Sequence, residues 1–157
     1  MKKVFLFVFS IVVSFLPGIV GAVFSPNGPS DLWYNALIKS SLNPAGWVFG
    51  VAWAILYILL GIALFLVITD KEKKNKKTLA YWLFAINIFF NALWSYLFFG
   101  LQMIGAGVIS VAVLIFISIW LMRSFLKINK TSGYLILPYI IWLFFALYLN
   151  GMIYYLN

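Results

Sequence analysis

Residues 45–68 read AGWVFGVAWAILYILLGIALFLVI, an apolar stretch without a single charged residue. An α-helix needs roughly 20 such residues to cross the hydrocarbon core of a bilayer. Four further stretches of this kind occupy residues 4–24, 79–100, 103–122 and 134–155. Because all five are continuously apolar, they do not show the alternation of membrane β-strands. The sequence predicts an all-α integral membrane bundle of five transmembrane helices, in a single domain over residues 1–157.

The composition agrees with a lipid environment and removes many chemistries. Of the 157 residues, 66% are hydrophobic and 9% are charged, and the mean hydropathy is +1.09. Soluble domains carry about a quarter charged residues. The chain has no cysteine and no histidine, and its three acidic residues, Asp31, Asp70 and Glu72, all lie at connections between stretches. We therefore expect no metal site, no cofactor and no intramembrane carboxylate for ion coupling.

The first apolar stretch has two interpretations. Lys2 and Lys3, the apolar run and the small residues Gly21 and Ala22 together imitate a secretory signal peptide. The run is longer than the usual signal core of about 7 to 15 residues, which favours a retained helix. Cleavage stays open as the alternative, because Pro17 could end such a core early.

The basic residues predict the orientation. Ten of the 11 Lys and Arg residues fall at the amino terminus or in the even-numbered connections, and only Lys39 falls on the other side. Basic residues near helix ends stay on the cytoplasmic side. We expect a multi-pass protein of the cell membrane with a cytoplasmic amino terminus and an outer carboxyl terminus. The net charge of +8 then reflects topology, so we expect contact with membrane lipid and no nucleic-acid partner.

The connection over residues 25–43 is the one substantial outer segment, and we expect it to act as a lid. It begins with the turn-rich string SPNGP at residues 25–29. Ser30 or Asp31 would cap a short helix that continues through Ile38. Asn43 and Pro44 would be the cap and the first residue of the second membrane helix.

Three of the predicted helices combine large rings with an amide or hydroxyl on one face. Residues four apart share a helix face, and this spacing groups Phe49 with Trp53 and Tyr57, Asn87 with Asn91 and Ser95, and Trp142 with Ala146 and Asn150, while Trp94 and Phe98 flank the second group. Such faces would form an intramembrane pocket for a planar conjugated ligand, whose acidic groups would favour the end near Lys39. The alternative is that these rings and amides only pack the bundle.

These residues resemble the tryptophan-rich sensory protein family, also called the translocator protein or peripheral-type benzodiazepine receptor family. The similar blocks are Trp33-Tyr34 with Leu37 through Lys39, Pro44 with Phe49, Trp53 and Leu56-Tyr57, Asn91 with Trp94-Ser95 and Phe98-Phe99, and Leu137-Pro138-Tyr139 with Trp142, Phe145-Ala146 and Leu149-Asn150. The last block is the most specific, and the resemblance extends along essentially the whole chain.

The resemblance implies a receptor or carrier that binds porphyrins, notably protoporphyrin IX, and benzodiazepine or isoquinoline carboxamide ligands, in tetrapyrrole handling or stress signalling. The implied pocket residues are Tyr34, Pro44, Phe49, Trp53, Tyr57, Asn91, Trp94, Ser95, Phe98, Trp142 and Ala146. For some bacterial members it also implies light-dependent degradation of protoporphyrin, for which Trp53 and Trp142 would be the catalytic tryptophans. An accessory bundle without a ligand is the third possibility.

Two departures from the family bear on partners. The chain ends Tyr154-Tyr155-Leu156-Asn157 without a basic residue, which argues against high-affinity cholesterol binding. The resemblance also implies a homodimer through small residues of the third helix, but that helix has no small pair at four-residue spacing. Ala106 and Ser110 of the fourth helix supply such a pair instead.

Overall fold

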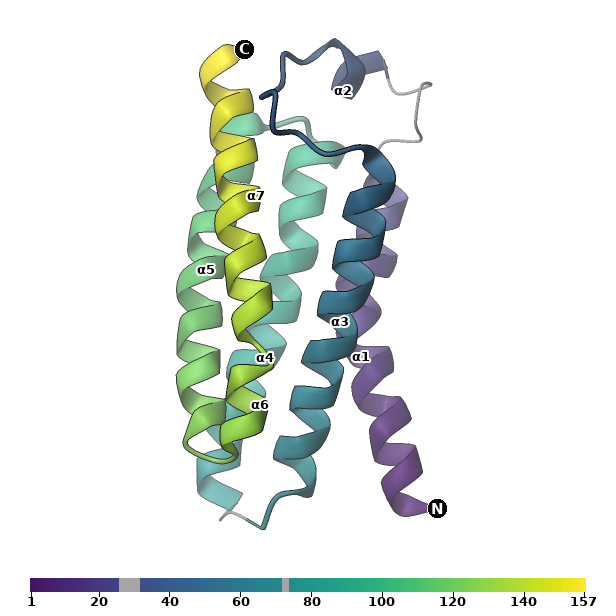
Figure 1. Ribbon diagram of the computed structural model, residues 1–157, viewed down its shortest axis with the longest axis vertical. Coiled ribbons are helices and arrows are strands. Elements are labelled where there is room, and N and C mark those ends of the chain that lie inside the picture. Colours follow the sequence, from purple (N-terminus) through teal and green to yellow (C-terminus); the bar gives the residue numbers. More distant parts are fainter. Residues whose placement is uncertain (26–31, 72–73) are drawn as a thin grey trace.

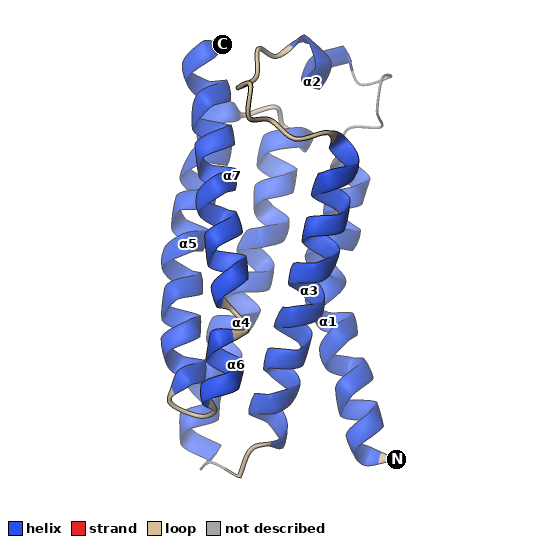
Figure 2. Ribbon diagram, in the orientation of Figure 1, coloured by secondary structure: helices blue, strands red, loops and turns tan. Residues whose placement is uncertain are grey.

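The protein folds as a bundle of long, nearly parallel and antiparallel helices (Figures 1 and 2). The computed structural model describes residues 1–25, 32–71 and 74–157, although not the side chains of residues 74–76. Its long helices are α1 (Lys2–Phe24), α3 (Gly46–Thr69), α4 (Lys74–Ser95), α5 (Ile104–Leu126) and α7 (Leu137–Leu156). Five helical segments are long and apolar enough to cross a membrane, and the described residues contain no strand. The predicted all-α membrane bundle is confirmed.

Three short elements modify this plan. The connection between α1 and α3 carries α2 (Leu32–Ala36), and the π-helix η2 (Tyr96–Gly100) extends α4. A single turn, α6 (Lys130–Tyr134), precedes α7, so the stretch expected over residues 134–155 is interrupted before Leu137. Pro138 accounts for the new start, since proline fits the first turn of a helix, where its missing N–H is not needed.

The start of α3 differs from the expectation. Asn43 and Pro44 are not its cap and first residue, because Ala45 holds the cap position and no side chain caps the helix. Ala45 is still extended, with ψ at 145°, which delays the helix to Gly46. The Asn43 amide instead donates to the carbonyl oxygen of Pro44 at 3.2 Å. The Ser30 and Asp31 caps proposed for the short helix lie outside the described residues.

The helix α1 packs on α3 through small residues. Its fully buried side chains include Ser10 and Ser14, whose hydroxyls donate back to carbonyl oxygens of α1 itself. Opposite them, a Cβ on Gly61 would lie 2.6 Å from the Ile11 side chain and 3.0 Å from its Cα. Small residues allow membrane helices to approach closely where hydrophobic exclusion from water cannot drive association.

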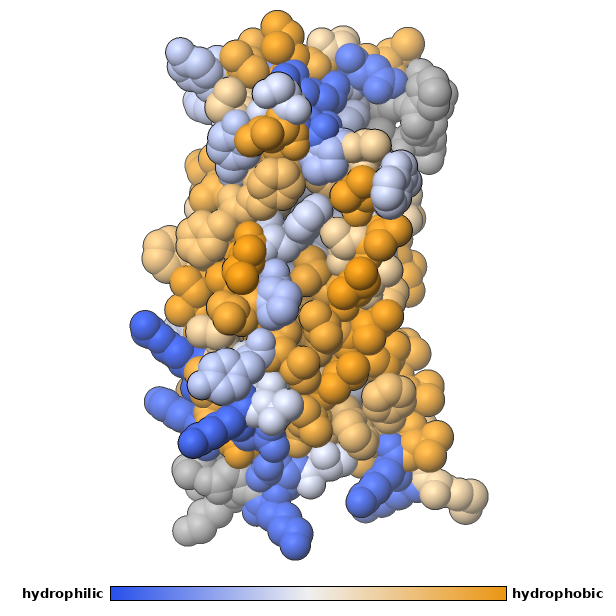
Figure 3. Space-filling model, viewed as in Figure 1, coloured by the Kyte–Doolittle hydropathy of each residue, from blue (hydrophilic) through white to orange (hydrophobic). Residues whose placement is uncertain are grey.

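The surface matches a bilayer. On the face seen in Figure 3, apolar side chains cover most of the middle of the molecule, and hydrophilic side chains gather towards its two ends. Large apolar side chains of the long helices, such as Phe89, Ile109 and Phe116, are exposed. The two chain termini lie at opposite ends of the bundle (Figure 1), as an odd number of crossings requires. Which end faces the cytoplasm stays a prediction.

The small pair suggested for a dimer interface is not available on the surface. Ser110 is buried within the protomer, so it does not reach a second copy of the chain. Spacing alone could not reveal this, because Ala106 and Ser110 share a face whichever way that face turns. The homodimer itself stays a prediction.

Candidate functional site

Trp53 of α3 is the centre of an aromatic cluster built from three helices. Its ring stacks on Tyr57 at 5.5 Å between centroids and lies 6.1 Å from Trp94 of α4. Tyr139 and Trp142 of α7 approach the same ring edge-on, at 6.2 and 6.4 Å. Offset and edge-to-face pairs at these separations are favourable beyond simple burial. We call these five residues the ring cluster.

Further rings connect the ring cluster to the connection before α3. Phe98 of η2 stacks on Trp94 at 6.1 Å and meets Trp33 edge-on at 5.7 Å. The neighbouring Phe99 meets Tyr34 at 5.6 Å, and the Lys39 ammonium lies 4.5 Å from the centre of the Tyr34 ring. The described part of the connection, residues 32–45, is therefore fastened onto η2 through its rings.

A buried series of hydrogen bonds holds the phenols of the cluster. Tyr57 donates to the Asn91 side-chain oxygen at 3.1 Å, and the Asn91 amide donates to the Tyr139 hydroxyl at 2.7 Å. Tyr139 donates to Asn87 at 3.3 Å, and Asn87 donates to Ser118 at 2.7 Å. The series joins α3, α4, α7 and α5. Asn91, expected to contact a ligand, thus has both ends of its amide engaged with neighbouring helices.

The indole N–H groups of Trp94 and Trp142 have different environments. Trp94 donates through Nε1 to the Asn150 side-chain oxygen at 3.2 Å, and the Asn150 amide donates to the Ala146 carbonyl oxygen at 2.8 Å. Trp142 Nε1 is buried and has no acceptor among the described residues. A buried donor without an acceptor costs about 1–3 kcal/mol.

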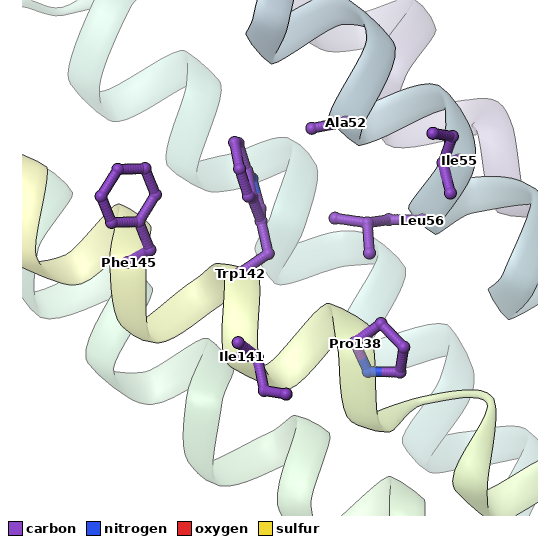
Figure 4. Close-up of a pocket in the computed structure, with 7 residues that line it drawn as sticks. All are labelled: Ala52, Ile55, Leu56, Pro138, Ile141, Trp142 and Phe145. Atoms are coloured by element: carbon purple, nitrogen blue, oxygen red, sulfur yellow. The ribbon is translucent and has the colours of Figure 1, made fainter. Parts of the chain in front are cut away.

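A cavity of about 390 Å³ lies beside Trp142, between α3 and α7. Figure 4 shows the Trp142 indole standing between the two helices, with Ala52 and Leu56 of α3 facing it. The lining of the cavity is almost entirely apolar and consists of Ala52, Ile55, Leu56, Pro138, Ile141, Trp142 and Phe145. Small-molecule sites occupy about 300–1,000 Å³ and combine an apolar lining with few polar groups. Trp142 is shared by this cavity and the ring cluster.

The structure brings most of the expected site residues into contact with one another. The ring cluster contains four of them, Trp53, Tyr57, Trp94 and Trp142. Phe49 contacts Trp142 at 6.0 Å between ring centroids. The contacts described above connect three more to the cluster, directly or through a neighbouring ring: Asn91, Phe98 and Tyr34. Ala146 is buried and contributes its carbonyl oxygen. Two residues lie apart: Ser95 faces Gly21 of α1, and Pro44 lies in the chain before α3.

The residues that sequence reasoning missed are mainly aliphatic. Ala52, Ile55 and Ile141 line the cavity, and nothing in their chemistry distinguishes them from other membrane-helix residues. Tyr139 was seen only as part of a motif, although its four-residue spacing from Leu143 and three-residue spacing to Trp142 place it on the buried side of α7. No three His, Cys, Asp or Glu side chains come together in the described ranges, and the amides of Asn87, Asn91 and Asn150 are already bonded within the protein, so the site offers mainly aromatic rings.

Comparison with known proteins gives a consistent result over nearly the whole chain. A sequence model described as the TspO/MBR family matches residues 9–156. A tryptophan-rich protein TspO of Chlorobaculum tepidum is 38% identical over 140 residues, which cover 89% of this chain and 88% of that protein. A tryptophan-rich sensory protein of Cereibacter sphaeroides is 33% identical, with 85% and 80% covered. The human translocator protein is 26% identical, with 79% and 74% covered.

Proposed function

Because this chain belongs to the TspO/MBR family of membrane proteins, we propose that it is a receptor or carrier for porphyrins such as protoporphyrin IX. Benzodiazepine-type and isoquinoline carboxamide compounds would occupy the same site. The single observation that carries the proposal is the position of Trp142. Its ring contacts Trp53 at 6.4 Å, its indole N–H lacks an acceptor within the described residues, and it lines a cavity of about 390 Å³.

The residues present suit a flat conjugated ligand. The aromatic groups of the site are the contacting rings of Trp53, Trp142 and Phe145. One aromatic pair contributes about 0.5–1.5 kcal/mol beyond the burial of its surface. Lys39, whose ammonium lies over the Tyr34 ring in the connection, is a positive charge that carboxylate groups such as the propionates of a porphyrin would favour at that end of the bundle.

The test is a titration of protoporphyrin IX into the protein in phosphatidylcholine nanodiscs, followed by porphyrin absorbance. We expect saturable binding that weakens about fivefold in Trp142→Phe, which keeps a ring but offers the ligand a smaller aromatic surface. Trp82→Phe is the matched control, since Trp82 is 66% exposed on the lipid-facing surface and should bind like the parent. A spectrum that never saturates would leave only the accessory-bundle interpretation.

A second candidate function is light-dependent degradation of the bound porphyrin. The observation that favours it is the contact between two oxidisable indoles, Trp53 and Trp142, of which Trp142 lines the cavity. Under illumination in air, the parent should lose porphyrin absorbance faster than Trp53→Phe or Trp142→Phe loaded to the same occupancy. Equal rates in all three proteins would contradict a role for the tryptophans.

A further inference from the structure

The cavity beside Trp142 opens sideways, towards the surface that faces the bilayer. Ile55 of α3 and Ile141 of α7 lie at its rim and are 52% and 62% exposed. Both belong to helices that are long and apolar enough to cross the membrane. In a bilayer this opening therefore meets acyl chains and not water.

The opposite route, through the connection, is fastened by hydrogen bonds. The backbone N–H of Ile38 donates to the Asn157 side-chain oxygen at 2.9 Å, and the Asn157 amide donates to the Ile38 carbonyl oxygen at 3.0 Å. Two residues further on, the hydroxyls of Ser40 and Tyr148 lie 3.0 Å apart. These contacts hold residues 38–40 to α7, in addition to the ring contacts of Trp33 and Tyr34 with η2.

At the cavity, α3 and α7 meet through ring contacts of Trp142 with Phe49 and Trp53 and through aliphatic groups. Within the described residues no side-chain hydrogen bond joins these two helices directly, because Tyr57 reaches Tyr139 only through Asn91 of α4. Their contact at the cavity is between Ala52, Leu56 and the rings and aliphatic groups of α7 (Figure 4). Such a contact can part and reclose without breaking a polar interaction, and lipid tails can solvate its apolar surfaces meanwhile.

We propose that the cavity between α3 and α7 is a lateral portal, through which a flat apolar ligand already dissolved in the bilayer reaches Trp142. The proposal rests on the proposed function, and it adds the phase from which the ligand comes and the helices between which it passes. A ligand of this class partitions into hydrocarbon, slides between Ile55 and Ile141, and packs against the Trp142 ring. The connection then serves as a fixed cover.

The chain has no cysteine, so the portal can be closed by a selective cross-link. The test variant is Ile55→Cys with Ile141→Cys, bridged across the opening by a bis-methanethiosulfonate reagent. The control is Val51→Cys with Ile55→Cys, two exposed positions on α3 whose bridge runs along the helix and not across the opening. The probe is protoporphyrin IX supplied in phosphatidylcholine vesicles, and the readout is the association rate from stopped-flow quenching of tryptophan fluorescence.

We expect the bridge across the opening to lower the association rate by about tenfold, and reduction of the bridge to restore it. The bridge along α3 should leave the rate unchanged. Asn157→Ala, which releases Ile38, should also leave it unchanged. Because each cross-linked variant is compared with itself after reduction, a folding defect cannot imitate the effect of the bridge.

The outcomes separate the two proposals. Saturable binding whose association rate is the same with and without the bridge across the opening would overturn the portal alone. Faster association in Asn157→Ala, with no effect of the bridge, would place the route under the connection and overturn the portal too. Absence of saturable binding in the parent protein would overturn the proposed function and the portal with it.

Discussion

Asn91 of α4 donates its side-chain amide to the hydroxyl of Tyr139 of α7 at 2.7 Å, inside the bundle. The Tyr139 hydroxyl in turn donates to the side-chain oxygen of Asn87, and the Tyr57 hydroxyl of α3 donates to the side-chain oxygen of Asn91. Each hydroxyl or amide in this series donates to the next side chain, up to Ser118, which donates to the Leu114 carbonyl oxygen. The series fixes the phenol rings of the cluster, so its loss should be felt both in stability and at the site.

Tyr139→Phe should destabilise the protein by about 1–3 kcal/mol, because it leaves the Asn91 donor and the Asn87 acceptor buried without their partner. The measurement is the free energy of unfolding in mixed micelles. Tyr155→Phe is the control, since Tyr155 is exposed, and it should change the free energy by less than about 0.5 kcal/mol. Equal effects of the two substitutions would contradict a structural role for the series.

Gly61→Ala should separate α1 from α3. The new Cβ would lie 2.6 Å from the Ile11 side chain and 3.0 Å from its backbone, so the helices must move apart at a cost of about 1–3 kcal/mol. Gly50→Ala, in the same helix, has no atom within 4 Å of the new Cβ and should be neutral or slightly stabilising. Thermal unfolding in detergent compares the pair. If Gly61→Ala unfolded at the same temperature as Gly50→Ala, the close α1–α3 contact would not be needed for stability.

Asn157→Ala should loosen the connection before α3. Ile38 loses the acceptor for its N–H and the donor to its carbonyl, so its amide should exchange with deuterium about tenfold faster. Tyr154→Phe, at an exposed position of the last turn of α7, should leave that exchange rate unchanged. Exchange at Ile38 that is equally slow in both variants would show that the ring contacts alone hold the segment.

Labelling of single cysteines should fix the orientation. Ser41 of the connection and Thr131 of α6 are both exposed, and the chain offers no native thiol. If the basic residues set the topology, Ser41→Cys reacts with an impermeant maleimide on intact cells, whereas Thr131→Cys reacts only after lysis. The reverse pattern would invert the predicted orientation without altering the fold.

The aromatic part of the site could be anticipated because helix geometry is local. The four-residue spacing of Phe49, Trp53 and Tyr57 places their rings on one face of any α-helix that contains them. The same reasoning placed Asn87 and Asn91 on one helix face. It could not predict that two tyrosines from other helices form hydrogen bonds with their amides. Partners across helices depend on relative depth and rotation, which one helix does not contain.

The sequence by itself determined five helices able to cross a membrane and the helix faces that carry the rings, and it predicted the side on which the basic residues lie. These follow from apolar length, charge and a period of 3.6 residues, all of which are properties of single segments. Only the tertiary structure decided that the cavity opens between Ile55 and Ile141, that Ser110 is turned inward and that the Trp142 N–H has no acceptor among the described residues. A cavity is the space left where two helix surfaces fail to interdigitate. It depends on both surfaces and on the angle at which the helices cross, so neither segment alone predicts it.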